Sequence, residues 1–371
     1  MKAPVLFTFG NAGKVLLLVL SCAVLSCDQT TVSSDEDSRS GFQTESEWLV
    51  AEHEIIDGGP GKDGIPPIEE PKFSVASEVT FIPDNRRVIG LIKDGEPTAY
   101  PYQILDWHEV VNDESQVTIT FCPLTATGIA WSPKEGPDFG TSGLIYRNNL
   151  IAYDRKTGSL WSQMRLRAIH GEHLGATVDP LNVLDTTWET WKSMFPESRV
   201  LNTNTGYSRD YKKYAYGSTY EDMDGVILFP TVNRTDTRLD AKDRVHGIFT
   251  EDSLDQDSNV RVYEYSAFGE DITTIHDEFE GEKFVIVGST KLSFVIAYQA
   301  ELNGEVLEFE PVQGELPVVM MDQSGTKWNV FGEAVSGPNA GGRLFPAKSY
   351  SGYWFAFRDM FNLPEIYGFE N

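Results

Sequence analysis

Residues Val117–Trp131 read VTITFCPLTATGIAW, and residues Phe284–Tyr298, which begin 167 positions further on, read FVIVGSTKLSFVIAY. Each segment holds two runs rich in β-branched and aromatic residues, separated by a short interval of turn-forming residues. Such runs are typical of β-strands, and two runs in close succession predict a β-hairpin. Because the two segments align without a gap, we expect two copies of one β-rich unit.

Three further blocks recur in the same order. They are DRKTGSLW (Asp154–Trp161) with DQSGTKW (Asp322–Trp328), the series Ala168, Gly171, Gly175 with Ala334, Gly337, Gly341, and Val88–Gly90 with Val245–Gly247. The blocks predict a first β-rich unit at residues 71–178, a helical connector at residues 179–236 and a second β-rich unit at residues 237–371. Features present in both copies are expected to be architectural, whereas features of one copy mark where a site would lie.

The remaining sequence from residue 71 belongs to the same fold class. Short runs of Val, Ile, Thr, Tyr and Phe alternate with Gly, Asn and Asp, and Asn148-Asn149 between two runs predicts a hairpin turn. Helical patterns are confined to Tyr102–Val111 and Asp185–Phe195, the second with an Asp or Thr cap and Pro196 as its stop. We therefore expect a mainly β or α+β fold of antiparallel strands, in two diverged tandem repeats with few helices. An all-α bundle is excluded.

Composition narrows the function classes. The chain has 371 residues, 40% of them hydrophobic, which is enough to build a full core and excludes wholesale disorder. Its 56 acidic residues against 30 basic ones give a formal net charge of −26. Because nucleic-acid binding needs a basic surface to neutralise phosphates, we expect no nucleic-acid partner.

The N-terminus has the pattern of an export signal. Lys2 and Lys14 are the only charged residues among the first 27, and the uncharged run Val15–Ser26 is too short for a membrane span. The run ends at Val24-Leu25-Ser26-Cys27, which resembles a bacterial lipobox with Cys27 as the lipidated residue; Cys22 is a second candidate, and a plain secretory signal is the alternative. Residues 28–70 hold 12 acidic and 2 basic residues and predict a flexible tether. The expected location is the extracytoplasmic cell envelope, with the membrane as partner through the lipid anchor.

Cys122 and His108 are the first candidates for chemistry. Once Cys22 is cleaved off and Cys27 carries lipid, Cys122 is the one free thiol, and Ser289 replaces it in the second copy. A thiolate with an imidazole suits copper or zinc, and a thiol with His108 as base could act as a nucleophile. Glu109 and Asn112 could orient His108 or contact a ligand. The alternatives are a buried apolar cysteine and a histidine held by structural hydrogen bonds.

Other polar residues allow weaker hypotheses. Arg155 becomes Gln323 in the second copy, so its guanidinium could bind a carboxylate or phosphate, although an internal ion pair is the simpler interpretation. His170 and His173 suggest a metal site but lack a helical HExxH frame. The acidic segment Glu251–Asp257 lacks the glycine and closing glutamate of an EF-hand, which favours a solvated loop over a calcium site.

Several strings allow a family comparison. They are DGIPPIEEPKF (Asp63–Phe73), AYP (Ala99–Pro101), DWHEVVND (Asp106–Asp113), FCPL (Phe121–Leu124), FGTSGL (Phe139–Leu144), YDRKTGSLWSQ (Tyr153–Gln163), TTWETW (Thr186–Trp191) and GYSRDY (Gly206–Tyr211). Together they resemble the bacterial and archaeal family known as domain of unknown function 3179. The resemblance places His108 and Cys122 on family motifs and implies no activity. Many members carry Cys-Pro-Leu-Cys where this chain has Thr125, which argues against a two-thiol mechanism.

Two functions from different classes follow from the sequence, and neither decides whether the protein is an enzyme. In the first, Cys122 and His108 form a copper or zinc site, or a redox site, in the first repeat. In the second, the protein is a non-catalytic binding module of the envelope. Its small-molecule or protein partner would then bind in the cleft between the two repeats.

Overall fold

The computed structural model of the chain describes residues 47–113, 116–132, 138–217, 220, 221, 223–233, 235–250 and 259–369. The predicted signal segment with Cys27, the part of the tether before Glu47 and the acidic segment Glu251–Asp257 lie outside these residues. The described part is β-rich, with several antiparallel sheets and three short α-helices, as the sequence predicted. No helix in these ranges is both long and apolar enough to cross a membrane.

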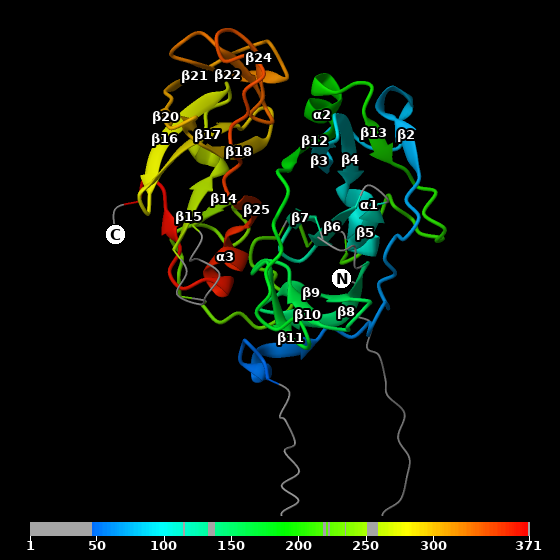
Figure 1. Cartoon of the computed structure of the whole chain (residues 1–371). Coiled ribbons are helices and arrows are strands. Elements are labelled where there is room, and N and C mark those ends of the chain that lie inside the picture. The colour runs from blue at the N-terminus through cyan, green and yellow to red at the C-terminus, as the bar shows by residue number, and fades with distance from the viewer. Residues whose placement is uncertain are drawn as a thin grey trace, which may run out of the picture. The chain divides into compact units, whose positions relative to one another are not determined.

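Two sheets, here called the two central sheets, resemble each other in strand order (Figure 1). The first sheet has the order β12-β3-β4-β13-β2 and the second sheet the order β25-β14-β15-β26. In each, the central strands are antiparallel, and a short strand from later in the chain adds in parallel, β13 on β4 and β26 on β15. The bounds are β2 (Phe73–Val75), β3 (Arg87–Lys93), β4 (Glu96–Pro101), β12 (Leu184–Thr187), β13 (Arg199–Leu201), β14 (Arg244–Phe249), β15 (Val260–Glu264), β25 (Ser349–Tyr353) and β26 (Glu365–Ile366).

The segments Val117–Trp131 and Phe284–Tyr298 each form a hairpin that supplies two strands of a three-stranded sheet. The first hairpin joins β6 to β7 with β5 alongside, and the second hairpin joins β17 to β18 with β16 alongside. The turns occupy residues 123–126 and 290–293, between the pairs Cys122–Thr127 and Ser289–Phe294. The bounds are β5 (Val110–Asp113), β6 (Val117–Cys122), β7 (Thr127–Trp131), β16 (Thr273–Phe279), β17 (Glu282–Ser289) and β18 (Phe294–Gln299).

The remaining strands form two larger sheets and one short ribbon. Their orders are β1-β8-β9-β10-β11, β21-β22-β23-β24 and β19-β20. The β8–β9 hairpin turns at Arg147 and Asn148, both with positive φ, one residue earlier than the predicted Asn148-Asn149. The bounds are β1 (Ile55–Asp57), β8 (Phe139–Tyr146), β9 (Asn149–Asp154), β10 (Leu160–Ser162), β11 (Arg167–His170), β19 (Glu301–Leu302), β20 (Glu305–Val306), β21 (Phe309–Pro311), β22 (Val318–Asp322), β23 (Lys327–Asn329) and β24 (Ala334–Ser336).

The helices are shorter than the sequence patterns suggested. Helix α1 (Tyr102–His108) ends where Glu109 adopts a φ of 58°, and the β-branched pair Val110-Val111 then enters strand β5, so the predicted helix to Val111 was too long. Helix α2 (Trp188–Met194) begins after Thr187, whose side chain accepts from the Thr190 amide, while Asp185 lies in β12. Part of the expected connector, residues 184–201, therefore contributes two strands to the first sheet.

Helices α2 and α3 (Trp354–Met360) pack on the two central sheets through glycines. A Cβ at Gly90 on β3 would lie 1.9 Å from the Trp191 ring, and a Cβ at Gly247 on β14 would lie 2.2 Å from the Phe357 ring. No larger residue leaves room for these rings. The recurring Val-x-Gly strings therefore mark where a helix meets each sheet.

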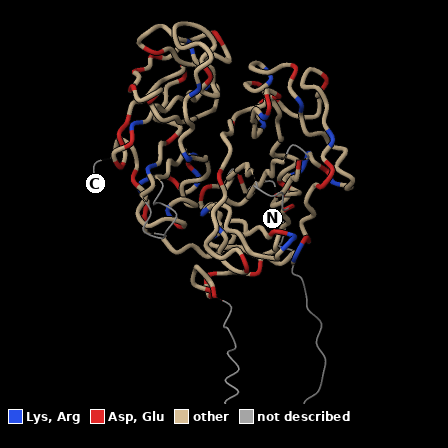
Figure 2. Tube along the Cα trace, in the orientation of Figure 1, with Lys and Arg blue, Asp and Glu red and all other residues tan. Residues whose placement is uncertain are grey.

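Charged residues are interspersed over the traced chain. Figure 2 shows Lys and Arg positions interspersed with Asp and Glu positions. Acidic positions outnumber basic ones, as the composition of 56 acidic and 30 basic residues requires.

Candidate functional site

Cys122 ends strand β6 inside a hydrophobic core. Its side chain is 2% exposed and belongs to the cluster that includes Leu124 and Leu150. Its Sγ lies 3.6 Å from the Asn148 carbonyl oxygen, to which the thiol donates. Burial raises the pKa of the thiol to about 11, and the Glu109 carboxylate adds to this effect. The thiol is therefore protonated at neutral pH, which makes it a weak nucleophile and a weak metal ligand.

His108 ends helix α1, and both of its ring nitrogens are engaged. Nδ1 lies 2.7 Å from the Pro66 carbonyl oxygen, and Nε2 lies 2.7 Å from the Tyr211 hydroxyl. Because a carbonyl only accepts, Nδ1 carries the proton and Nε2 accepts from Tyr211. Burial lowers the pKa of the imidazole, although the bond to Pro66 opposes that shift. No hydrogen bond or ring contact joins His108 to Cys122 within the described residues.

No metal centre is assembled in the described ranges. They contain no group of three or more His, Cys, Asp or Glu side chains placed to hold an ion. His170 packs its ring on Trp48 with centroids 4.3 Å apart, and the His173 ring lies 6.0 Å from that of Trp161. The copper or zinc site at Cys122 and His108 thus stays a prediction.

Glu109 is the residue that the structure brings to Cys122. Both line a small cavity of about 40 Å³ together with Tyr216, whose hydroxyl donates to Glu109 Oε1 at 2.9 Å. Burial raises the pKa of Glu109 to about 7, and the bond from Tyr216 opposes the shift. The space suits water molecules rather than a substrate.

Asn112 and Arg155 have structural partners. The Asn112 amide donates to Glu69 Oε2 and to the Phe139 carbonyl oxygen, each at 2.8 Å. Arg155 pairs with Asp63 at 2.9 Å and with Glu69 at 2.6 Å. Arg155 therefore has the internal ion pair that was the simpler interpretation. Asn112 on β5 binds Glu69, and Arg155, which follows β9, binds Asp63 and Glu69. Both residues therefore hold the segment that contains Asp63 and Glu69 against these strands.

The repeated Asp-Gly-Trp turns are architectural, as predicted. The Trp161 indole N–H donates to Asp154 Oδ2, and the Trp328 indole N–H donates to Asp322 Oδ2, both at 3.1 Å. Each carboxylate also accepts from a backbone N–H of its own turn.

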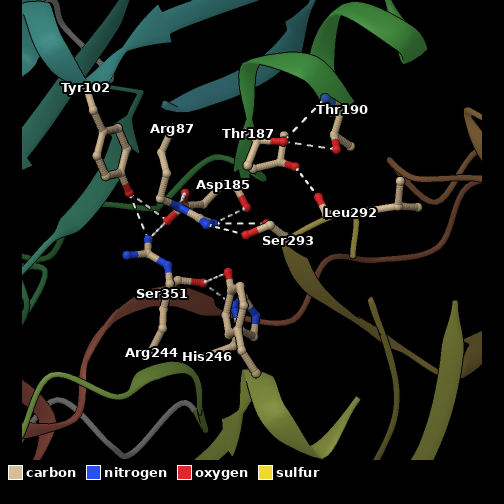
Figure 3. A network of polar contacts seen from close by, with 12 residues as sticks. Arg87, Tyr102, Asp185, Thr187, Thr190, Arg244, His246, Leu292, Ser293 and Ser351 are labelled. Carbon is tan, nitrogen blue, oxygen red and sulfur yellow. Dashed lines mark hydrogen bonds and ion pairs between the residues drawn. The ribbon is translucent and has the colours of Figure 1, made fainter. Parts of the chain in front are cut away.

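A polar network that sequence reasoning missed joins the two central sheets (Figure 3). Asp185 on β12 accepts from Arg87 Nε at 2.8 Å, from the Tyr102 hydroxyl at 2.7 Å and from Arg244 Nη2. Figure 3 shows the two guanidinium groups, one from each sheet, pointing at this carboxylate. The recurring strings could have revealed the pair, because an arginine precedes Val88 in one string and Val245 in the other.

Beside this network lies a cavity of about 170 Å³, here called the junction cavity. Its lining comes from the start of β3 and the residues before it, helix α1, β6 with its hairpin turn, residues 214–221 and the second sheet: Asn85, Arg86, Arg87, Tyr102, Asp106, Phe121, Pro123, Ala126, Tyr214, Glu221, Arg244 and Tyr353. The lining thus combines three guanidinium groups, two carboxyl groups and four aromatic rings. Small-molecule sites in proteins combine apolar walls with a few placed polar groups in this way.

Asp106 is the unusual member of this lining. Its side chain is 2% exposed, and its Oδ2 has no hydrogen-bond partner among the described residues. The nearest cation is Arg86, 3.7 Å away, which itself donates to Glu221 at 3.0 Å. Burial raises the pKa of Asp106 well above its ordinary value, with a further contribution from Glu221. A buried polar atom without a partner is costly, so such an atom beside a cavity points to a ligand.

Comparison with known proteins gives one match. No curated protein and no solved structure is significantly similar to the chain. A family model described as "Protein of unknown function (DUF3179)" matches residues 62–364, which include β3, the junction cavity and most of both central sheets. The match covers most of the chain and agrees with the resemblance of its motifs, so the protein belongs to the DUF3179 family.

Proposed function

We propose that this protein is an exported, lipid-anchored binding protein of the cell envelope that holds a small molecule in the junction cavity. The observation that carries the binding function is Asp106, whose buried Oδ2 has no hydrogen-bond partner among the described residues and only the Arg86 guanidinium at 3.7 Å, in a cavity with three arginines. Export and anchoring are supported by the uncharged run Val15–Ser26 followed by Cys27.

A duplicated architecture is part of the proposal. The orders β12-β3-β4-β13 and β25-β14-β15-β26, with the same parallel addition at one side, support two related units. Recurring sequence blocks fall at equivalent places in them. A cavity lined by both units is the site expected of a binding module built in this way.

The test is a thermal-shift screen of the purified full chain in detergent, using small polar metabolites. A ligand at a hundred times its dissociation constant stabilises the folded state by about 2.7 kcal/mol. We expect at least one compound to raise the Tm of the natural protein but not of Ala126→Leu, which fills the junction cavity. Ala340→Leu, the same change at an exposed position, is the control. A screen without any hit, or with equal shifts in Ala126→Leu, contradicts the proposal.

A further inference from the structure

The two hairpin turns contact the opposite sheets reciprocally. The Tyr353 amide of the second sheet donates to the Thr125 carbonyl oxygen of the first hairpin turn at 2.9 Å. The Thr186 hydroxyl of the first sheet donates to the Leu292 carbonyl oxygen of the second hairpin turn at 2.8 Å. Thr125 and Leu292 occupy the same position in the aligned segments. Each turn can therefore be compared with the other.

The residue after Thr125 and the residue after Leu292 differ between the two hairpin turns. Ser293 binds Arg87 through its hydroxyl at 2.6 Å and through its carbonyl oxygen at 3.0 Å. The equivalent residue in the first hairpin is Ala126, and both have positive φ, 53° and 50°. Ala126 carries no hydroxyl, and the junction cavity lies there, next to Arg244. The junction cavity thus lies beside Ala126 and Arg244, where the second hairpin turn has Ser293 bound to Arg87.

The polar groups of the junction cavity have unused bonding capacity. Arg244 Nε is buried and has no hydrogen-bond partner in the described part of the chain, and Asp106 Oδ2 is in the same condition. Arg86 is balanced by Glu221, whereas Arg87 and Arg244 share Asp185. Burial raises the pKa of Asp106 and favours its neutral form, in which three guanidinium groups face the carboxylates of Glu221 and Asp185. One positive charge is then left over.

We infer that the junction cavity binds a small organic monocarboxylate, which accepts from Arg244 Nε. Burial raises the pKa of Asp106 and so favours its neutral carboxyl group, which can donate to the other oxygen of the ligand. The inference rests on the proposed function, because it names the ligand class of the same site. A carboxylate supplies the missing negative charge and offers two acceptor oxygens, and charge-assisted bonds to guanidinium are among the strong hydrogen bonds of proteins. The tyrosine and phenylalanine rings flank its apolar part.

The volume limits the size of this ligand. A cavity of about 150 Å³ is enough to hold benzene, a molecule of six carbon atoms. The junction cavity, at about 170 Å³, therefore suits a carboxylate of about six non-hydrogen atoms, such as lactate. Drug-sized ligands need larger pockets, of about 300–1,000 Å³.

The experiment compares four small probes by calorimetric titration of the full chain in detergent. The probes are sodium lactate, glycerol, ethanolamine and L-alanine, which differ in charge at similar size. Two variants accompany the natural protein. Ala126→Ser puts into the cavity the hydroxyl that the second hairpin already has, and Ser293→Ala removes that hydroxyl on the other side.

The expected result is that lactate binds, and that Ala126→Ser weakens its affinity at least tenfold whereas Ser293→Ala does not. Equal lactate affinity in Ala126→Ser overturns the inference, because the anion then binds elsewhere. If glycerol or ethanolamine binds instead and Ala126→Ser weakens that binding, the carboxylate class is wrong while the proposed binding function stands. If no probe binds, the carboxylate inference fails, and the wider thermal-shift screen decides the proposed function separately.

Discussion

At the scale of single residues, burial is the main cause of the shifted pKa values of the candidate site residues Cys122, His108 and Glu109. His108 and Glu109 are neighbours in the sequence, and Cys122 follows at the end of the next strand but one. The sequence suggested that Cys122 and His108 act together. In the structure helix α1 ends at His108. Glu109 takes a positive φ of 58°, and the chain then continues as strand β5. His108 then binds Tyr211, whereas Glu109 shares a small cavity with Cys122.

The Glu109 carboxyl predicts a pH dependence of stability. Its pKa rises from 4.5 when the chain is unfolded to about 7 in the folded protein, so the folded state binds the proton more tightly. Its contribution, about 3 kcal/mol, is fully present below pH 4.5 and is lost as the pH rises through 7. Glu109→Gln, which stays neutral, should flatten the fall in the free energy of unfolding between pH 4.5 and 7, measured by urea titration. Parallel pH profiles of the two proteins would contradict this assignment.

The Cys122 thiol predicts slow modification in the folded protein. With a pKa of about 11 against an ordinary 9.0, its thiolate fraction at pH 8 is lower by about a hundredfold. Iodoacetamide should therefore alkylate the folded chain at least a hundred times more slowly than the chain in urea, as followed by mass spectrometry. Equal rates would restore the hypothesis of a reactive cysteine.

At the scale of elements, the sequence predicted strands well and the ends of helices poorly. The runs on either side of residues 123–126 and 290–293 became hairpins because their β-branched and aromatic residues pack on both faces of a buried sheet. The pattern after Tyr102 still looked helical beyond His108, because hydrophobic spacing does not reveal where Glu109 takes positive φ. Tertiary pairing of Val110 and Val111 with β6 decided that boundary.

The packing of helix α3 on the second sheet predicts a strong effect of one methyl group. Gly247→Ala would place a Cβ 2.2 Å from the Phe357 ring, and relieving this overlap should lower the free energy of unfolding by about 1–3 kcal/mol. Gly225 has no heavy atom within 4 Å of the same built position, so Gly225→Ala should change stability by less than about 0.5 kcal/mol. The measurement is the midpoint of urea unfolding for both variants. Similar midpoints would show that helix α3 can move away from the added methyl group without loss of stability.

At the scale of the whole molecule, the sequence revealed recurring blocks but not how they meet. Arg87 and Ser293 are 206 positions apart, and no local pattern predicts that they bind each other. The sequence named none of the residues of the junction cavity as a group, and the predicted cleft between two repeats stays a prediction. Asp106 lies two positions from His108 and was not predicted as a site residue, because its burial results from packing between distant segments of the chain.

Membrane attachment is the prediction that belongs to this scale. If Cys27 carries the lipid, Cys27→Ala should move the protein from the membrane fraction to the soluble extracytoplasmic fraction after cell fractionation. Cys22→Ala is the matched control, since it removes the other candidate cysteine of the same segment and should leave the protein on the membrane. The opposite pattern would place the anchor at Cys22. Retention of both variants would contradict lipid attachment through a single cysteine.

The reciprocal contact of turns and sheets has a consequence for the time course of folding. A chain emerges from the ribosome from its N-terminus, and β25, which pairs with β14 and contacts the first hairpin turn, is complete only at Tyr353. Until then the Thr125 carbonyl lacks the Tyr353 amide. Contacts between residues this distant in sequence form slowly, because a long loop must close before they contribute. The nascent chain would thus stay incompletely folded until residue 353 has been synthesised, which leaves a long interval in which a chaperone can bind it.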